Sequence, residues 1–240
     1  MHKAKRLLEE ALAGSGEGEA EGDLVRAARA VVAELGAPER LLPLVTELAA
    51  GVGDPAGCAL LSYRHVLGFD KLLLIDGGPR HRLRVHVWHP GASAREDVHN
   101  HRSPLASHVV RGALGMEVYE PVGDGEGGRS AERYREALAD KGGDWLLEPV
   151  GRGRLRLTQS ALYAAGSGYA LPSYTLHRAW CASAATAVTL FLETGAGRRR
   201  YTDVFTDPDT ADAPARAVAK KPLDVRDYLA ELKVLTGLID

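Results

Sequence analysis

The histidines of this chain are concentrated in one region. Five of the nine lie between residues 86 and 108, namely His86, His89, His99, His101 and His108. His99 and His101 are separated by one residue, and in an extended strand such a pair points to the same face. One metal ion could therefore bind both imidazoles. Taken alone, the pair fits two histidines in an exposed loop equally well.

A third histidine lies further along the chain in a suitable context. In "GSGYALPSYTLHRAWC", Gly166, Pro172 and His177 are spaced Gly-x5-Pro-x4-His. This spacing resembles the second motif of the cupin superfamily, Gly-x5-Pro-x-Gly-x2-His-x3-Asn. Two positions depart from that motif, because Tyr174 replaces its second Gly and Cys181 replaces its Asn.

The first cupin motif, His-x-His followed by a Glu and then a Gly, is partly present. His99 and His101 match the histidine pair and Gly112 matches the final Gly, whereas Leu105 stands at the Glu position. The resemblance covers roughly residues 57–206. It implies an RmlC-like jelly-roll barrel whose mouth holds a metal bound by His99, His101 and His177.

The missing Glu narrows the chemistry that the resemblance implies. Three neutral imidazoles leave a divalent ion with its full charge and with open coordination positions. Within the superfamily this arrangement is similar to that of cysteine dioxygenase-type enzymes, which use ferrous iron. Fe(II) is therefore the expected cofactor. Zn, Ni or Mn acting as a Lewis acid is the alternative.

The similarity to cysteine dioxygenase extends upstream of the histidine pair. By this match Arg64 would hold a substrate carboxylate, a role that suits the planar guanidinium fork. The alternative is an arginine on a strand surface. That family's Ser-x-His-x-Tyr trio is absent from "TAVTLFLETG", and its thioether-forming Cys would fall near Leu105. A thiol substrate is therefore not supported.

Further residues are expected to contact the substrate. His86 and Trp88 share a strand face that either lines the barrel or packs under the N-terminal helices. Tyr174 lies close to His177 in sequence and could act as an acid, a base or a hydrogen-bond donor, or could simply line the mouth of the barrel. Glu117 and Tyr119 occupy alternate positions on the strand after Gly112, one face of which should line the cavity.

His108 is a candidate fourth ligand. If residues 105–111 form a regular strand, Leu105, Ser107 and Val109 share one face and His108 points the other way. A bulge in the strand would reverse this orientation.

Many short strands with Gly and Pro turns are predicted between residues 57 and 206. They favour a mainly β jelly-roll barrel over a parallel βαβ fold, because helices between the strands are lacking. Residues 58–67 are strand-like. Residues 132–142 are expected to form an irregular insert, with a short helix as the alternative.

Helices are expected to flank the barrel on both sides. The amphipathic segments 3–13, 23–36, 38–52 and 222–239 predict them. These helical arms would form either a lid over the barrel or a homodimer interface. The predicted divisions are a helical region 1–54, a cupin barrel 55–206, and a linker with a C-terminal helix 207–240.

Composition excludes several classes of function. The 240 residues carry a net charge of −2, which argues against nucleic acid and acidic membranes as partners. No apolar run reaches the roughly 20 residues of a membrane span. The N-terminus lacks the apolar core of a signal peptide, and the two cysteines form no CxxC pair.

We expect a cytoplasmic, metal-dependent oxygenase that acts on O2 and a small polar, amino-acid-like molecule. A lyase or isomerase and a non-catalytic small-molecule binder are the alternatives.

Overall fold

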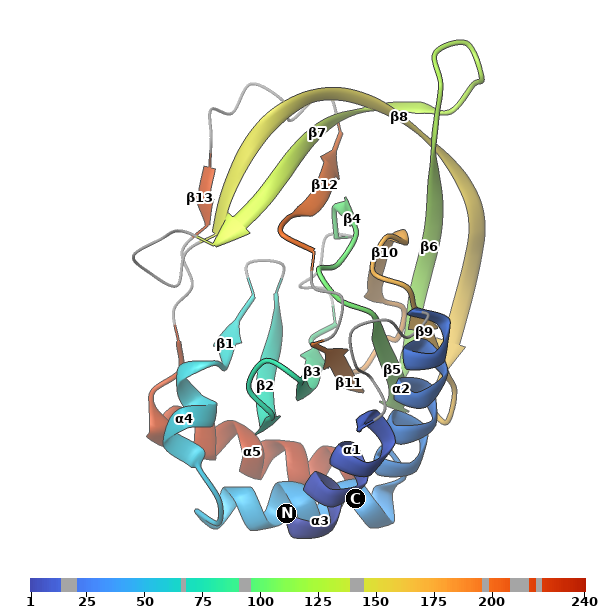
Figure 1. The fold of residues 1–240 in the computed structure, drawn as a ribbon. Coiled ribbons are helices and arrows are strands. Elements are labelled where there is room, and N and C mark those ends of the chain that lie inside the picture. The colour runs from blue at the N-terminus through green and yellow to red at the C-terminus, as the bar shows by residue number, and fades with distance from the viewer. Residues whose placement is uncertain are drawn as a thin grey trace.

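Two antiparallel sheets form the centre of the computed structural model, which describes residues 1–13, 21–65, 68–90, 96–138, 145–195, 199–207, 216–218 and 222–240 (Figure 1). In spatial order the first sheet contains β1 (Tyr63–Arg64), β2 (Phe69–Asp76), β3 (His81–Trp88), β11 (Ala187–Thr194), β5 (Leu105–Arg111) and β9 (Gly168–Leu171). The second contains β13 (Arg216–Val218), β8 (Trp145–Ala164), β6 (Ala113–Val122), β10 (Leu176–Cys181), β4 (Val98–His99), β12 (Thr202–Thr206) and β7 (Arg129–Leu138).

Eight of these strands follow the order of a jelly roll. The order β3-β11-β5-β9 in one sheet lies against β4-β10-β6-β8 in the other, which is the arrangement that two Greek keys produce. The turn from β5 to β6 passes through Gly112, whose φ of +75° suits a residue without a Cβ. The predicted mainly β jelly roll, with a break at Gly112, is therefore confirmed.

The segment 58–67, expected to be strand-like, begins instead with the end of a helix, and its last two residues lie outside the described part of the chain. α4 (Pro55–Leu60) begins after Asp54, whose carboxylate accepts a hydrogen bond from the backbone N–H of Gly57 at 2.9 Å. Pro55 occupies the first turn, where its missing N–H costs nothing. Capping by Asp54 thus outweighs the apolar run, and strand pairing is left to the two residues of β1.

The segment 132–142, expected to be an irregular insert or a short helix, is a strand over the part that the structure describes. Up to Leu138 it belongs to β7, which pairs along its whole length with β8 and also with β12. β7 and β8 lie side by side and arch across the end of the molecule that is away from the helices (Figure 1). Polar side chains on both faces hid the strand in the sequence, because its partner strands rather than an apolar face stabilise it.

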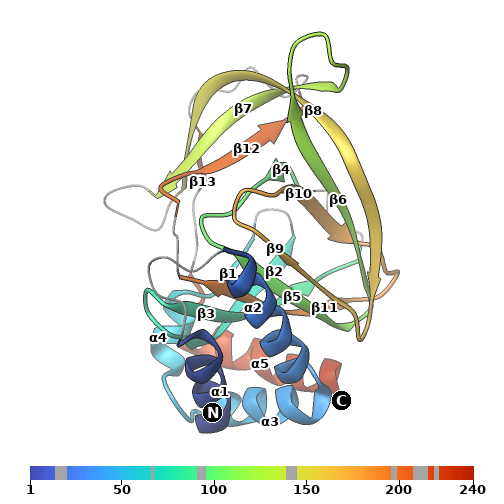
Figure 2. The same ribbon diagram turned by 45° about the vertical axis from the view of Figure 1, so that its right-hand side comes forward.

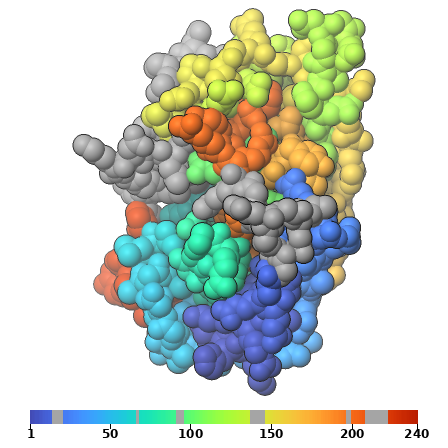
Figure 3. All heavy atoms as spheres, viewed as in Figure 1, coloured from blue at the N-terminus to red at the C-terminus, as the bar shows by residue number. Residues whose placement is uncertain are grey.

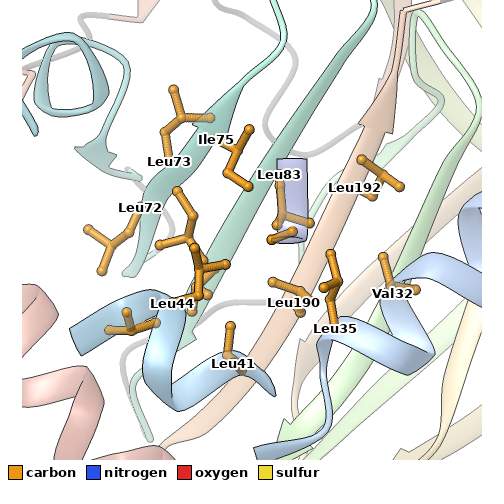
Figure 4. Packing of buried hydrophobic residues seen from close by; sticks show 14 of the residues in the cluster. Val32, Leu35, Leu41, Leu44, Leu72, Leu73, Ile75, Leu83, Leu190 and Leu192 are labelled. Atoms are coloured by element: carbon orange, nitrogen blue, oxygen red, sulfur yellow. The ribbon is translucent and has the colours of Figure 1, made fainter. Parts of the chain in front are cut away.

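The helices cover the outer face of the first sheet, at the end of the molecule opposite β7 and β8 (Figures 2 and 3). They are α1 (His2–Leu12), α2 (Glu21–Leu35), α3 (Pro38–Ala49) and, at the C-terminus, α5 (Val225–Ile239). Figure 4 shows the resulting core, in which Val32, Leu35, Leu41 and Leu44 pack against Leu72, Leu83, Leu190 and other sheet residues. In the part of the chain that the structure describes, none of the helices is long and apolar enough to span a membrane.

This packing corrects one prediction about the helical arms. The alternating residues Leu83, Val85 and Val87 of β3 face the helices and are buried in the same core. The opposite face of β3 is left to line the interior of the barrel. The helices are therefore a layer behind the sheet and not a lid over the barrel mouth.

Candidate metal centre

His99 and His177 lie side by side on neighbouring strands. β4 and β10 are antiparallel, and the Cα atoms of these two residues are register partners. Their ring centroids are 4.9 Å apart. Two histidines that are 78 positions apart in sequence (177 − 99 = 78) are thus brought together by one strand pairing.

His101 completes the group from the chain just after β4. Its backbone N–H donates to the carbonyl of Ser173 at 3.1 Å, which holds the segment against the loop before β10. The ring centroid of His101 lies 4.9 Å from that of His99 and 5.1 Å from that of His177. One ligand atom from each of the three residues lies within 4.8 Å of the others. The three predicted ligands therefore converge.

Hydrogen bonds fix which nitrogen of two rings is left for a metal. Nδ1 of His99 is 2.8 Å from the carbonyl oxygen of Asp97, and Nδ1 of His177 is 3.1 Å from the carbonyl oxygen of Thr175. A carbonyl oxygen only accepts, so each Nδ1 carries the proton and each Nε2 keeps its lone pair. This is the usual support for metal-bound histidines.

The surroundings also keep the three rings neutral. Burial lowers the pKa of His99 and of His177 to about 4, and it lowers the pKa of His101 well below its usual value. At neutral pH all three imidazoles therefore offer a lone pair. Three neutral nitrogen donors suit Zn(II), Fe(II), Ni(II) or Cu(II) better than Mg(II) or Ca(II), so the group fits a transition metal.

The histidine group lies in the wall of a cavity of about 290 Å³. His86 and Trp88 line this cavity. Of the two predictions for their strand face, the one in which it lines the barrel therefore holds. The His86 ring stacks on Phe191, with the centroids 4.7 Å apart, and Phe191 in turn lies 6.0 Å from the ring of His101. Nε2 of His86 is buried without a hydrogen-bond partner among the described residues.

Arg64 lies outside the cavity, contrary to the predicted carboxylate clamp. Its neighbours Tyr63 and His65 line the cavity, and alternation along the strand turns Arg64 outward. The Arg64 side chain is 71% exposed and donates to Glu231 of α5 at 2.7 Å. The alternative of a surface arginine is the one that the structure supports.

Tyr174 also points away from the histidine group. It lies in the turn closed by a hydrogen bond from the Thr175 N–H to the Pro172 carbonyl, and it is 64% exposed. Its closeness to His177 in sequence does not bring its hydroxyl into the cavity wall. The predicted role of Tyr174 as an acid or base is therefore wrong.

Glu117 and Tyr119 lie on the face of β6 that points away from the cavity. Glu117 accepts hydrogen bonds from Arg178 and from the Tyr119 hydroxyl, each at 2.6 Å. Arg178 alternates on β10 with His177 and Ala179, both of which line the cavity. The predicted substrate contacts of Glu117 and Tyr119 are therefore corrected to an ion pair and a hydrogen bond on the other face of the sheet.

His108 and Leu105 are placed as a regular β5 predicts. His108 faces α2, where a Cβ added to Gly36 would lie 2.5 Å from its ring, so it is not a fourth ligand. Leu105 is buried with Met116, Tyr169 and Phe191. The position of the superfamily's Glu is thus part of an apolar cluster.

Several charged residues that line the cavity were missed, and three of them lie near the histidines in strand register or in sequence. Arg84 shares the inward face of β3 with His86, Lys71 lies beside His86 in register, and Glu96 precedes the histidine pair. Burial raises the pKa of the Glu96 carboxyl. The alternation of residues 84, 86 and 88 along one strand face was the available signal for Arg84.

Comparisons with known proteins concern the fold. No family model matches the chain, and no curated protein sequence matches it. Similar solved structures include the cupin domain of Cnp3 from Schizosaccharomyces pombe, with 8% identity and a TM-score of 0.34, covering 52% of this chain and 64% of that one. An RmlC-like cupin from Shewanella frigidimarina has 16% identity and a TM-score of 0.35, covering 56% and 83%.

An enzyme is also among the similar structures. Hydroxypropylphosphonic acid epoxidase from S. wedmorenis has 13% identity and a TM-score of 0.33, covering 52% of this chain and 50% of that one. This chain spans less than two thirds of that epoxidase and of the Cnp3 domain. Likeness at this level carries no argument about the reaction, and the resemblance to cysteine dioxygenase stays a prediction. The strand order is that of a jelly roll, and a three-histidine group lies in the wall of its cavity.

Proposed function

We propose that this protein is a non-haem Fe(II)-dependent oxygenase that acts on a small polar substrate. One observation carries the proposal. Three neutral imidazoles converge at the wall of a cavity, and no carboxylate of the described residues joins them. A site with three protein ligands leaves coordination positions open for other molecules.

Each residue of the site has a defined task in this proposal. His99, His101 and His177 would hold the metal. His99 and His177 would bind it through Nε2, because their Nδ1 atoms donate to backbone carbonyls. Trp88 and Phe191 form apolar walls that displace water from the substrate. Bound ferrous iron supplies the one-electron chemistry that a reaction between O2 and an organic molecule requires.

Glu96 favours a second candidate function. A carboxyl group in the same cavity as the histidines could move a proton to or from a substrate carbon or oxygen. With Zn, Ni or Mn as a Lewis acid, the same cavity would then serve a lyase or an isomerase. Such a reaction needs no O2.

Metal analysis and oxygen uptake test the proposal together. The purified protein is analysed for its metal content, then loaded anaerobically with Fe(II) and assayed in an oxygen electrode with amino acids, hydroxy acids and thiols. Substrate-dependent O2 uptake that disappears in His99→Ala and His177→Ala is the expected result. Turnover without O2, abolished by Glu96→Gln, would favour the lyase or isomerase instead.

A non-catalytic binder gives a third pattern in these experiments. In that case a ligand raises the thermal unfolding midpoint but is recovered unchanged, whatever metal is added. Substituting His99 or His177 without any change in bound metal would contradict both catalytic candidates, because both depend on the histidine group.

A further inference from the structure

The wall of the cavity that holds the histidine group carries a cation, Arg84, for which the described residues supply no ion pair. Arg84 lines the cavity and its Nη1 donates to the carbonyl of Leu61 at 2.8 Å. Within the described part of the chain, no carboxylate is in salt-bridge contact with its guanidinium. Glu193 and Asp76 act on it only at longer range. A partly buried guanidinium that is held by one carbonyl keeps donors available for an anion.

His86 presents a second unsatisfied group two residues further along the same strand face. This side chain is buried, and its Nε2 has no partner among the described residues. Buried polar atoms in native proteins almost always have a hydrogen-bond partner, so an exception that lines a cavity points to a ligand. Arg84 and His86 lie about 7 Å apart along β3, as the rise of two strand residues requires.

Phe191 connects Arg84 and His86 to the group of His99, His101 and His177, here called the histidine triad. It is the register partner of Arg84 on β11, its ring stacks on His86, and its ring lies 6.0 Å from that of His101. Arg84, His86 and the histidine triad all line the same cavity, so one short molecule bound beside Phe191 could contact all three.

Lys71 adds positive charge to the same wall. It is the register partner of His86 on β2, and its ammonium lies 5.2 Å from the centre of the Phe69 ring. Its charge acts on His86, His99 and His101. By contrast, the other arginine on this strand face, Arg82, is already paired with Asp76 at 3.4 Å.

We infer that the cavity binds a small hydroxy-carboxylate or a similar short carboxylate with one further polar group. Arg84 holds the carboxylate with help from the charge of Lys71, and Nε2 of His86 hydrogen-bonds the second polar group beside the triad. A carboxylate fits because its two oxygens match the planar fork of a guanidinium. The inference rests on the proposed function, since it names the substrate class of that site, but its test needs no turnover.

Calorimetric titration of the whole chain, metal-free and Zn(II)-loaded, tests the carboxylate contact. The probes are 3-hydroxypropionate and its neutral amide, 3-hydroxypropanamide. We expect the acid to bind and the amide to bind far more weakly in both states. Arg84→Gln should weaken binding of the acid roughly 10- to 100-fold, the range of a hydrogen bond to a charged group. The matched control Arg82→Gln should leave the dissociation constant unchanged.

A milder variant guards against an unfolded Arg84→Gln protein. Arg84→Lys keeps the charge but loses the fork, so it should bind the acid with intermediate strength. Equal binding of acid and amide would overturn the inference, and so would an Arg84 variant that folds and binds the acid as tightly as the parent chain.

His86→Phe tests the second contact. This substitution keeps an aromatic ring on Phe191 and removes Nε2. We expect it to weaken binding of 3-hydroxypropionate while leaving the binding of propionate, which lacks the hydroxyl, unchanged. Parallel losses for both acids would assign His86 a packing role only. If the acid binds through Arg84 but no metal supports O2 uptake, the proposed oxygenase fails while the carboxylate site stands.

Discussion

Asn100, which lies between two of the histidines that form the metal group, is joined to Asp203 of β12 by three hydrogen bonds. Its Nδ2 donates to the Asp203 carboxylate at 3.2 Å, its Oδ1 accepts from the Asp203 N–H at 2.8 Å, and its own N–H donates to the Asp203 carbonyl at 3.2 Å. Arg133 and Arg199 bind the same carboxylate. The backbone that carries His99 and His101 is thus fixed by contacts to a distant strand.

Asn100→Ala should therefore weaken metal binding without touching a ligand. The substitution removes both side-chain hydrogen bonds and frees the segment between His99 and His101. We expect the affinity for Zn(II) to fall by roughly 10- to 100-fold, as for other residues that orient metal ligands. Competition with a chelating dye measures this change.

Arg102→Ala is the matched control for that experiment. Arg102 follows His101, and its hydrogen bond to the Glu136 carbonyl is long, at 3.5 Å. Its removal should leave the Zn(II) affinity near that of the parent chain. If Asn100→Ala and Arg102→Ala lose affinity equally, the Asn100–Asp203 contact has no special part in placing the histidines.

Stabilisation of the fold by Zn(II) should depend on the three histidines of the triad and not on His108. We expect Zn(II) to raise the unfolding free energy of the parent protein by about 2.7 kcal/mol at a free concentration 100 times the dissociation constant. His99→Ala and His177→Ala should abolish this stabilisation, whereas His108→Ala should keep it, because His108 faces α2. Thermal unfolding with and without Zn(II) measures the difference. Loss of the stabilisation in His108→Ala would return that residue to the ligand set.

The three converging histidines could be predicted from the sequence, two of them from local geometry and the third from the resemblance of its surroundings to a known motif. Spacing by two residues puts His99 and His101 on one side of an extended chain, and the motif around His177 supplied the third ligand. Of the two elements that were assigned wrongly, α4 carried a local signal that was overlooked, namely Asp54 as a cap followed by Pro55. β7 depends on pairing with β8 and β12, which no local pattern shows.

The substrate-contacting residues were harder to predict, because a shift of one residue reverses the face of a strand. Arg64 is turned outward while its neighbour Tyr63 lines the cavity. On β3 both faces are largely buried, one against the helices and one around the cavity. Apolar alternation therefore could not tell which face of β3 carries the site, and Arg84 was left unassigned.

Gly36 and His108 form a close contact that a methyl group should disrupt. A Cβ at Gly36 would lie 2.5 Å from Cδ2 of His108 and 2.7 Å from the carbonyl oxygen of Val32. We expect Gly36→Ala to lower the unfolding free energy by about 1–3 kcal/mol, the usual cost of overpacking. Made in a His108→Ala background, the same change should cost less, because only the clash with the Val32 carbonyl remains. Urea unfolding of the four proteins measures this coupling, and equal costs in both backgrounds would contradict it.

Cys58 should make stability depend on pH in the alkaline range. Burial raises the pKa of this thiol from 9.0 to about 11, so the folded protein holds the thiol proton more tightly than the unfolded chain does. The stabilising contribution is complete below pH 9 and is lost as the pH rises through 11, by at most about 2.7 kcal/mol for two pKa units. Urea unfolding between pH 8 and pH 11 measures the loss.

Cys58→Ser is the control for this prediction. It removes the titrating group but retains a donor for the Leu74 carbonyl, which the thiol contacts at 3.8 Å. The serine variant should lose less stability over this range, because its remaining pH dependence comes from other groups that both proteins share. Parallel pH profiles for the two proteins would show that the Cys58 thiol does not contribute.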